Sequence, residues 1–260
     1  MAGATAGRTG REPLSVQIRF IGSGNAFSDG GRTHACIHLT GPGTSLLLDC
    51  GGSALPAIKK VVDPETIDAI AISHLHGDHF GGLPFLIMEQ HYAGRTRPLV
   101  IVGPPDLRAR STAAAVALFQ DFYGPAGPTL RYPLEWRVLT AEPALIGGAM
   151  VSGHPVEHVE ESEPHGLRVR VGERLIAYSG DATWSDALPR LAEGADLFIC
   201  EATNFATPHP VHLSVAELRA HRAELHCARL AVTHLGNETL AHLGEVDDLE
   251  VAADGTVLEL

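Results

Sequence analysis

Short apolar runs alternate with amphipathic stretches along most of the chain. Runs such as 68–72 and 99–102 are rich in Ile, Val, Leu and Ala and are bounded by polar residues, Gly or Pro, which is typical of buried strands. The stretch 106–122 instead carries apolar residues on one face at helical spacing. This alternation predicts an α/β protein in which two mixed sheets form a sandwich flanked by helices.

The same patterns place the individual elements. Helices are expected at 54–62, 83–92, 106–122 and 215–224. Strands are expected at 16–21, 35–39, 45–49, 68–72, 99–102, 134–139, 150–158, 166–169, 175–178, 196–203 and 229–234. Gly41-Pro42-Gly43 predicts a hairpin between the second and third of these strands.

Composition indicates one soluble globular domain. No Pro, Gly or Ser-rich linker divides the 260 residues, so we expect a single domain over 14–260 after a disordered, Gly-rich tail at 1–13. The tail lacks the apolar segment of a signal peptide, and no apolar run is long enough for a membrane span. A cytoplasmic protein without a membrane partner is therefore expected, and a homodimer is compatible with the sequence.

Charge argues against a polyanionic partner. The formal net charge is -12, and Lys59 and Lys60 are the only lysines. Because basic residues supply most of the affinity for nucleic acid, the sequence favours a small-molecule substrate over a nucleic acid. A local cluster of arginines, Arg95, Arg97, Arg108 and Arg110, is the alternative source of phosphate contacts.

The largest concentration of possible metal ligands in the chain follows the expected strand at 68–72. The segment from His74 to His79 has the pattern H-x-H-x-D-H. In an extended segment His74 and His76 point the same way, while Gly77 allows Asp78 and His79 to turn elsewhere. Imidazole and carboxylate ligands without thiolate suit zinc first, with manganese, iron or nickel as alternatives.

Several other expected strands end in an imidazole or a carboxylate. They lead to Asp49, Asp181, Glu201 and His234, while His212 stands before a capping box. Some of these residues can instead have an ordinary structural role. Asp49 can cap a turn, Asp181 can cap a helix, and His212 can be an ordinary surface residue.

These motifs resemble the metallo-β-lactamase superfamily, and in particular its ribonuclease Z and phosphodiesterase branch. The resemblance extends from about Val16 to His234. It implies an αβ/βα four-layer sandwich with a metal-dependent hydrolytic site in a cleft along one edge. It also implies that Asp49 supports the metal loop through hydrogen bonds and does not touch metal.

The resemblance implies two divalent metal ions. The first would be bound by His74, His76 and His158, the second by Asp78, His79 and His234, and Asp181 would bridge both. His154 and His165 are rivals of His158, because each also lies near the end of a strand.

The resemblance further implies phosphodiester hydrolysis. Asp78 would orient the attacking hydroxide, and His212, held by Glu201, would protonate the leaving group. A small or cyclic phosphodiester is the favoured substrate. The alternatives are a lactone, thioester or aryl sulfate ester on the same metal site, ribonuclease Z-type RNA processing, and a non-catalytic metal-binding module.

Two departures from ribonuclease Z argue against tRNA as the substrate. Cys200 replaces the first His of the H-E-A-T segment of that group. Ribonuclease Z relatives also carry a long basic arm between the third and fourth motifs, whereas only residues 159–180 separate His158 from Asp181 here. We therefore expect no tRNA 3′-processing activity.

Overall fold

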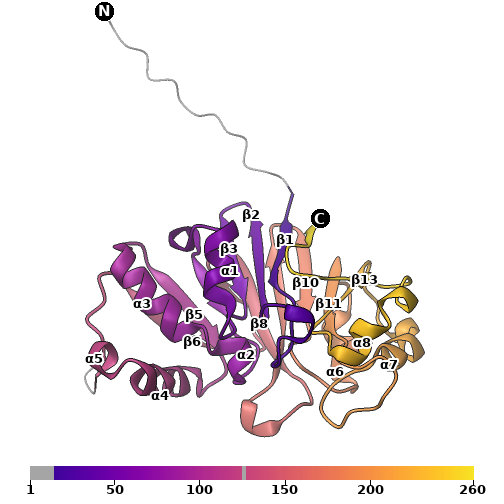
Figure 1. The fold of residues 1–260 in the computed structure, drawn as a ribbon. Helices are drawn as coiled ribbons and strands as arrows, with labels where there is room; N and C mark the ends of the chain where they lie inside the picture. The colour runs from indigo at the N-terminus through magenta and orange to yellow at the C-terminus, as the bar shows by residue number, and fades with distance from the viewer. Residues whose placement is uncertain (1–14, 125–126) are drawn as a thin grey trace, which may run out of the picture.

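The computed structural model describes residues 15–124 and 127–260, so the expected tail at 1–13 lies outside the described residues. Two seven-stranded sheets pack face to face, and helices cover the outer face of each sheet (Figure 1). The predicted αβ/βα four-layer sandwich of two mixed sheets is therefore confirmed.

Each sheet is half antiparallel and half parallel. The first has the strand order β14-β1-β2-β3-β4-β5-β6, and its strands from β3 to β6 run parallel. Its bounds are β1 Gln17–Gly22, β2 Cys36–Gly41, β3 Thr44–Leu48, β4 Ala69–Ala71, β5 Leu99–Gly103, β6 Leu134–Val138 and β14 Val257–Glu259.

The second sheet mirrors this arrangement. Its order is β13-β12-β11-β10-β9-β8-β7, and its strands from β10 to β13 run parallel. Its bounds are β7 Ala144–Ile146, β8 Ala149–Pro155, β9 His165–Val171, β10 Arg174–Tyr178, β11 Leu197–Glu201, β12 Leu230–Thr233 and β13 Glu250–Val251.

The helices lie on both sides of this pair of sheets. In Figure 1, α1, α3 and α4 lie beside the first sheet, and α6, α7 and α8 lie beside the second. The α-helices are α1 Ala54–Val61, α2 Gly77–Phe80, α3 Leu83–Ala93, α4 Leu107–Leu118, α5 Gln120–Tyr123, α6 Ala187–Ala192, α7 Val215–Ala220 and α8 Asn237–Ala241. The 3-10 helices are η1 Asp29–Gly31, η2 Pro64–Thr66, η3 Glu160–Ser162, η4 Arg222–Glu224 and η5 Leu243–Glu245.

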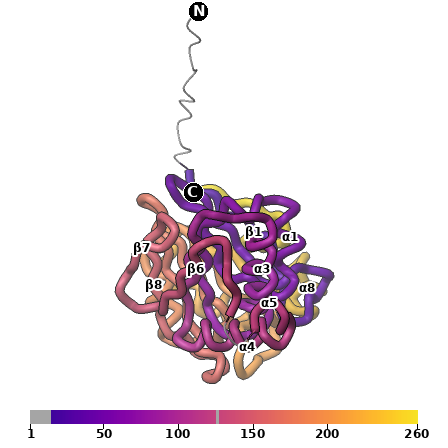
Figure 2. Tube along the Cα trace, turned by 90° about the vertical axis from the view of Figure 1, so that its left-hand side faces the viewer, coloured from indigo at the N-terminus to yellow at the C-terminus, as the bar shows by residue number. Residues whose placement is uncertain are grey.

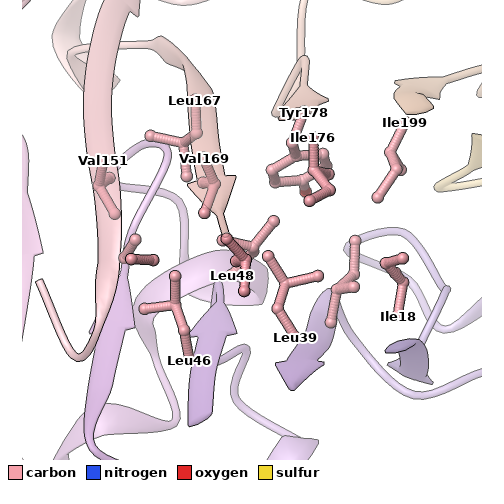
Figure 3. Close-up of a cluster of buried hydrophobic side chains, with 14 of the residues drawn as sticks. Ile18, Leu39, Leu46, Leu48, Val151, Leu167, Val169, Ile176, Tyr178 and Ile199 are labelled. Atoms are coloured by element: carbon pink, nitrogen blue, oxygen red, sulfur yellow. The ribbon is translucent and has the colours of Figure 1, made fainter. Parts of the chain in front are cut away.

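The main core lies between the sheets. Figure 3 shows Ile18, Leu39, Leu46 and Leu48 of the first sheet facing side chains of the second, including Ile176. Side chains alternate between the two faces of a strand. Leu47 accordingly points to the other face and packs in the cluster beneath the helices. Burial on both faces explains why these strands are continuous apolar runs.

The outer strands β6 and β7 bring the two sheets together at one side. Figure 2 views the molecule from this side, where both strands face the reader. The Arg137 guanidinium on β6 donates a hydrogen bond of 3.0 Å to the Leu145 carbonyl on β7. This contact helps to join the sheets at the side away from β13 and β14.

The backbone bends at Gly77, as expected, because α2 begins there. Two other local predictions were wrong in detail. The long helix expected at 106–122 is divided into α4 and α5 at Phe119, whose φ of -142° is not helical. The helix expected at 215–224 ends at Ala220 and is followed by η4. No helix in the described part of the chain is long and apolar enough to cross a membrane.

The arginine cluster proposed from the sequence does not form one phosphate-binding surface. The side chain of Arg95 is almost fully buried, and its guanidinium donates hydrogen bonds to several backbone carbonyls, including that of Ile67 at 2.7 Å. Arg97 pairs with Asp68, and Arg110 donates to a backbone carbonyl. The buried Arg95 therefore stabilises the fold.

Candidate metal centre

The parallel strands bring the candidate residues to one edge of the sandwich. Carboxyl ends of parallel strands meet at the same sheet edge, which is the usual place for sites in α/β proteins. Asp49 follows β3, α2 follows β4, Asp181 follows β10, and His234 follows β12. Residues from both sheets therefore converge at this edge, where α2 lies at the lower centre of Figure 1.

Three of these strand ends turn through a left-handed residue. Asp49, Gly180 and His234 have φ values of 59°, 60° and 61°. Such values are uncommon for residues other than glycine, and they often occur at functional sites. At these positions the chain leaves its strand sharply.

Asp49 organises the site from behind. Its carboxylate accepts hydrogen bonds from the Ser73 amide at 2.7 Å, the Ser73 hydroxyl at 2.9 Å, the Tyr178 hydroxyl at 2.9 Å and His79 Nδ1 at 2.7 Å. The side chain is fully buried. These contacts match the supporting role that the resemblance implied for Asp49.

A first cluster gathers three imidazoles. His76 Nδ1 lies 3.2 Å from His74 Nε2 and 3.2 Å from His158 Nε2. Asp181 Oδ2 lies 3.7 Å from the same His74 nitrogen and 3.9 Å from the same His158 nitrogen. These are the residues that the sequence assigned to the first metal, together with the bridging aspartate.

A second cluster lies on the other side of Asp181. Asp181 Oδ1 is 3.2 Å from His79 Nε2 and 3.3 Å from His234 Nε2. Asp78 Oδ2 is 3.3 Å and 3.2 Å from the same two nitrogens. Each carboxylate oxygen of Asp181 therefore faces a different cluster, as a bridging ligand requires.

Hydrogen bonds at Nδ1 orient the His74 and His79 rings so that Nε2 of each ring points into the site. His79 Nδ1 donates to Asp49, so the ring directs its Nε2 toward the second cluster. His74 Nδ1 lies 3.1 Å from Ser73 Oγ, which itself donates to Asp49 and must accept from the ring. Such partners are typical of metal-binding histidines.

The same arrangement holds for the two ligands contributed by the second sheet. His158 Nδ1 donates to the Val211 carbonyl at 2.6 Å. His234 Nδ1 lies 3.1 Å from Thr203 Oγ1, which donates to Glu201 at 2.6 Å and must therefore accept from the ring. Both rings thus direct Nε2 toward their cluster.

The unpaired polar atoms and the spacing of the ligand atoms in both clusters suit a bound metal ion. His79 Nε2 and Asp181 Oδ1 are buried, and neither has a hydrogen-bond partner among the described residues. In a tetrahedral site with bonds of ~2.0–2.1 Å, neighbouring ligand atoms are about 3.3 Å apart. The separations of 3.2 Å and 3.3 Å across both clusters are close to this spacing.

Electrostatics differs between the clusters. Burial lowers the pKa of His74, His76 and His158, which favours neutral imidazoles with available lone pairs. Burial would also lower the pKa of His79, but the Asp181 carboxylate raises it well above its usual value. A metal ion that binds the second cluster therefore displaces protons.

His212 forms an ion pair with Glu201 beside the two clusters. Its Nδ1 donates to Glu201 Oε1 at 2.8 Å, and the Glu201 side chain is fully buried. Burial alone would lower the pKa of His212, but the hydrogen bond and charge of Glu201 raise it to about 9. His212 is therefore a protonated side chain at neutral pH in the metal-free protein.

The structure places the rivals of His158 elsewhere. His154 Nε2 lies 3.0 Å from Ser152 Oγ, and His165 Nδ1 donates to the Glu163 carbonyl at 2.8 Å. Neither residue belongs to a ligand cluster among the described residues. Thr203 is the contact that the sequence did not single out, and its position two residues after Glu201 was the available signal.

A cavity of about 600 Å³ opens over the centre. His76, Asp78, Asp181, His212 and His234 line one part of it. A loop after β1 and the start of α8 contribute much of the remainder. The volume lies within the range of pockets for small ligands, about 300–1,000 Å³.

Sequence comparisons identify related proteins. A sequence model for the family "Anti-Pycsar protein Apyc1" matches residues 16–258. The uncharacterized protein ML1173 of Mycobacterium leprae is 34% identical over 199 residues, which cover 73% of this chain and 66% of that protein. A ribonuclease Z of Methanothermobacter thermautotrophicus is 28% identical over 234 residues, covering 72% and 74% of the two chains.

Solved structures share the fold. The metallo-β-lactamase fold protein YhfI from Bacillus subtilis superposes with a TM-score of 0.74 at 23% identity, covering 95% of this chain and 99% of that one. A diphosphatase from the PhnP family gives a TM-score of 0.73 at 20% identity, covering 94% and 98%. The strand ends, the paired clusters and these matches lead to one conclusion: the chain belongs to the Anti-Pycsar protein Apyc1 family and has the metallo-β-lactamase fold.

Proposed function

We propose that this protein is a metal-dependent phosphodiesterase that hydrolyses a small or cyclic phosphodiester. The observation that carries the proposal is the position of Asp181, whose two oxygens face separate clusters of imidazole and carboxylate groups. Paired metal sites of this kind are typical of phosphoryl-transfer enzymes.

In this proposal the ligands divide as the sequence predicted. His74, His76 and His158 would bind one ion, Asp78, His79 and His234 would bind the other, and Asp181 would bind both. Neutral nitrogen and carboxylate oxygen donors favour zinc, with manganese, iron or nickel as alternatives. Two such ions, when bound, activate water and neutralise charge on phosphoryl oxygens.

The remaining side chains would position the substrate and move a proton. Asp78 lines the cavity, where its carboxylate can accept a hydrogen bond from the attacking water. His212 also lines the cavity, and its bond to Glu201 leaves Nε2 directed away from that carboxylate. A protonated His212 can therefore donate its Nε2 proton to the departing oxygen while Glu201 stabilises the charged ring.

The cavity supports a small substrate. Neither Lys nor Arg occurs among the described residues that line it, so this surface lacks the permanently charged side chains that would bind several phosphates. The segment between His158 and Asp181 forms only η3, β9 and β10. It therefore supplies no arm for tRNA, although several curated relatives are named ribonuclease Z.

Initial rates on a substrate panel test the proposal. Metal-loaded protein would be assayed with bis(p-nitrophenyl) phosphate, a cyclic nucleotide, a lactone, an aryl sulfate and a pre-tRNA. We expect the largest kcat/KM with the cyclic nucleotide and no accurate cleavage of the pre-tRNA. A lactone or sulfate ester that reacts faster than both phosphodiesters would contradict the proposal. Asp181→Ala serves as the control for contaminating hydrolases.

A further inference from the structure

An exposed aromatic side chain stands at the mouth of the cavity. Phe27 is 84% exposed, yet it lines the same cavity as His76, Asp78 and Asp181. A large apolar ring in water gains favourable contacts when a ligand covers it. One ligand in this cavity can therefore touch both the candidate metal centre and the Phe27 ring.

The loop that carries Phe27 is held by a buried amide. Asn25 is 4% exposed, and its Oδ1 accepts hydrogen bonds from the amides of Phe27 at 3.1 Å and Asp29 at 3.2 Å. Asn25 Nδ2 donates to the Asp29 carboxylate at 2.8 Å. The loop therefore has a defined conformation although its tip is exposed.

The same loop is anchored to α8 on the second half of the sandwich. The Asp29 carboxylate accepts hydrogen bonds from the Asn237 amide at 3.1 Å and from Asn237 Nδ2 at 2.8 Å. Figure 1 shows this loop, which follows β1, beside α8. Because its anchors are in place before a ligand arrives, Phe27 is a preorganised contact surface.

We infer that Phe27 is a specificity-determining residue that stacks on a planar aromatic ring of the substrate. The inference rests on the proposed function and assigns to Phe27 the contact that holds the non-phosphate part of its substrate. The described lining contains no Lys or Arg, which supports the inference, because recognition of the non-phosphate part then comes from stacking and from polar side chains such as Asn204. Stacking between a base and an aromatic side chain tolerates every base.

A matched pair of substrates separates ring recognition from hydrolysis. Adenosine 3′,5′-cyclic phosphate has the base, and methyl riboside 3′,5′-cyclic phosphate has the same phosphodiester without it. With metal-loaded protein, Phe27→Ala should lower kcat/KM for the nucleotide roughly tenfold more than for the baseless compound, mainly through KM. Phe27→Trp should restore the preference.

A surface variant and a binding measurement complete the test. Leu145→Ala removes another exposed apolar side chain, 63% exposed on β7 and outside the cavity lining, and should leave the preference unchanged. Calorimetry with adenosine 5′-monophosphate and ribose 5-phosphate measures ring recognition without turnover. Phe27→Ala should selectively weaken binding of the nucleotide.

The outcomes distinguish the inference from the proposed function. If the wild-type protein hydrolyses neither cyclic compound, the proposed function fails, and the calorimetric comparison alone decides the role of Phe27. Equal effects of Phe27→Ala on the paired compounds, or no effect on either, would overturn the inference. The same holds if the wild-type protein binds adenosine 5′-monophosphate no more tightly than ribose 5-phosphate.

Discussion

Asp181 is the residue through which the two candidate metal sites are coupled. Its Oδ2 faces His74 and His158, and its Oδ1 faces His79 and His234. Burial would raise the pKa of this carboxyl group, but the surrounding imidazoles hold it well below its usual range. The side chain is therefore an anion in a buried position, ready to bind cations on both sides.

Asp181→Ala should lower occupancy of both sites. Elemental analysis of protein purified without chelators should find close to two equivalents of metal in the wild type, because two of the clusters share Asp181. The variant should retain less than about one equivalent, since each site loses a charged ligand. Loss of only one metal would show that Asp181 does not bridge.

His212→Ala should separate proton donation from metal binding. The ring lies outside the two ligand clusters that share Asp181, so metal content should stay the same. For a phosphodiester with an alkoxide leaving group, kcat should fall about 10²- to 10⁴-fold, the usual contribution of a general acid. A p-nitrophenolate leaving group should show a much smaller loss. Equal losses for both groups would exclude His212 as the proton donor.

Glu201→Gln tests the positioning of that donor through the pH profile. Glu201 raises the pKa of His212 by accepting its Nδ1 proton. A general acid loses activity as the pH rises through its pKa, so removing the negative charge should move the alkaline limb of kcat to lower pH. An unchanged limb together with a lower kcat would indicate a purely structural role for Glu201.

At the scale of the elements, sharp turns after parallel strands determine where the ligands lie. Gly180 follows β10 in a left-handed conformation and precedes Asp181. A Cβ atom on Gly180 would come within 2.9 Å of the Ser73 Cβ, which lies on the chain leading to the metal loop. Packing at Gly180 thus couples the strand end of the second sheet to the loop of the first.

Gly180→Ala should therefore destabilise the protein and loosen metal binding. Gly172 is the matched control, because it has a similar φ of 58° but no atom within 4 Å of an added Cβ. Both variants should lose about 1–2 kcal/mol of unfolding free energy from backbone strain. Urea denaturation should show an additional loss of about 1 kcal/mol or more for Gly180→Ala alone. Equal losses would mean that the contact with Ser73 is unimportant.

At the scale of the whole molecule, charge and topology together argue against tRNA processing. The chain has a net charge of -12, and the short connection between His158 and Asp181 is occupied by η3, β9 and β10. Arg95, which the sequence offered as part of a basic cluster, is buried in the fold. Few cations are therefore placed to neutralise phosphates near the centre.

We accordingly expect weak binding of pre-tRNA with little dependence on salt. Filter binding between ~50 mM and ~200 mM salt should give a shallow slope, because each phosphate contact contributes about -0.9 to the slope for a duplex. A curated ribonuclease Z assayed in parallel provides the positive control. Sub-micromolar affinity with accurate 3′ cleavage would show that another surface replaces the arm.

Local patterns in the sequence are enough to predict the fold class and most of the candidate ligands. Buried parallel strands have continuous apolar sequences because both of their faces are covered. Leu46 and Leu48 pack between the sheets, and Leu47 packs on the opposite face beneath the helices. His74, His76, Asp78 and His79 lie within one short segment, so their proximity is a property of the local chain. The family resemblance then gave roles to the isolated residues at other strand ends.

The tertiary structure was needed to tell which of several similar residues belong to the site, because distant segments of the chain form their surroundings. His154, His158 and His165 all lie near the end of an expected strand, but among them His158 alone joins the cluster of His74 and His76 in the loop before α2. Phe27 gave no signal beyond a turn after β1, and its place at the cavity depends on Asn25, Asp29 and α8. Long-range packing between the two sheets sets these contacts, whereas the local hydrophobic pattern specifies only where strands and helices form.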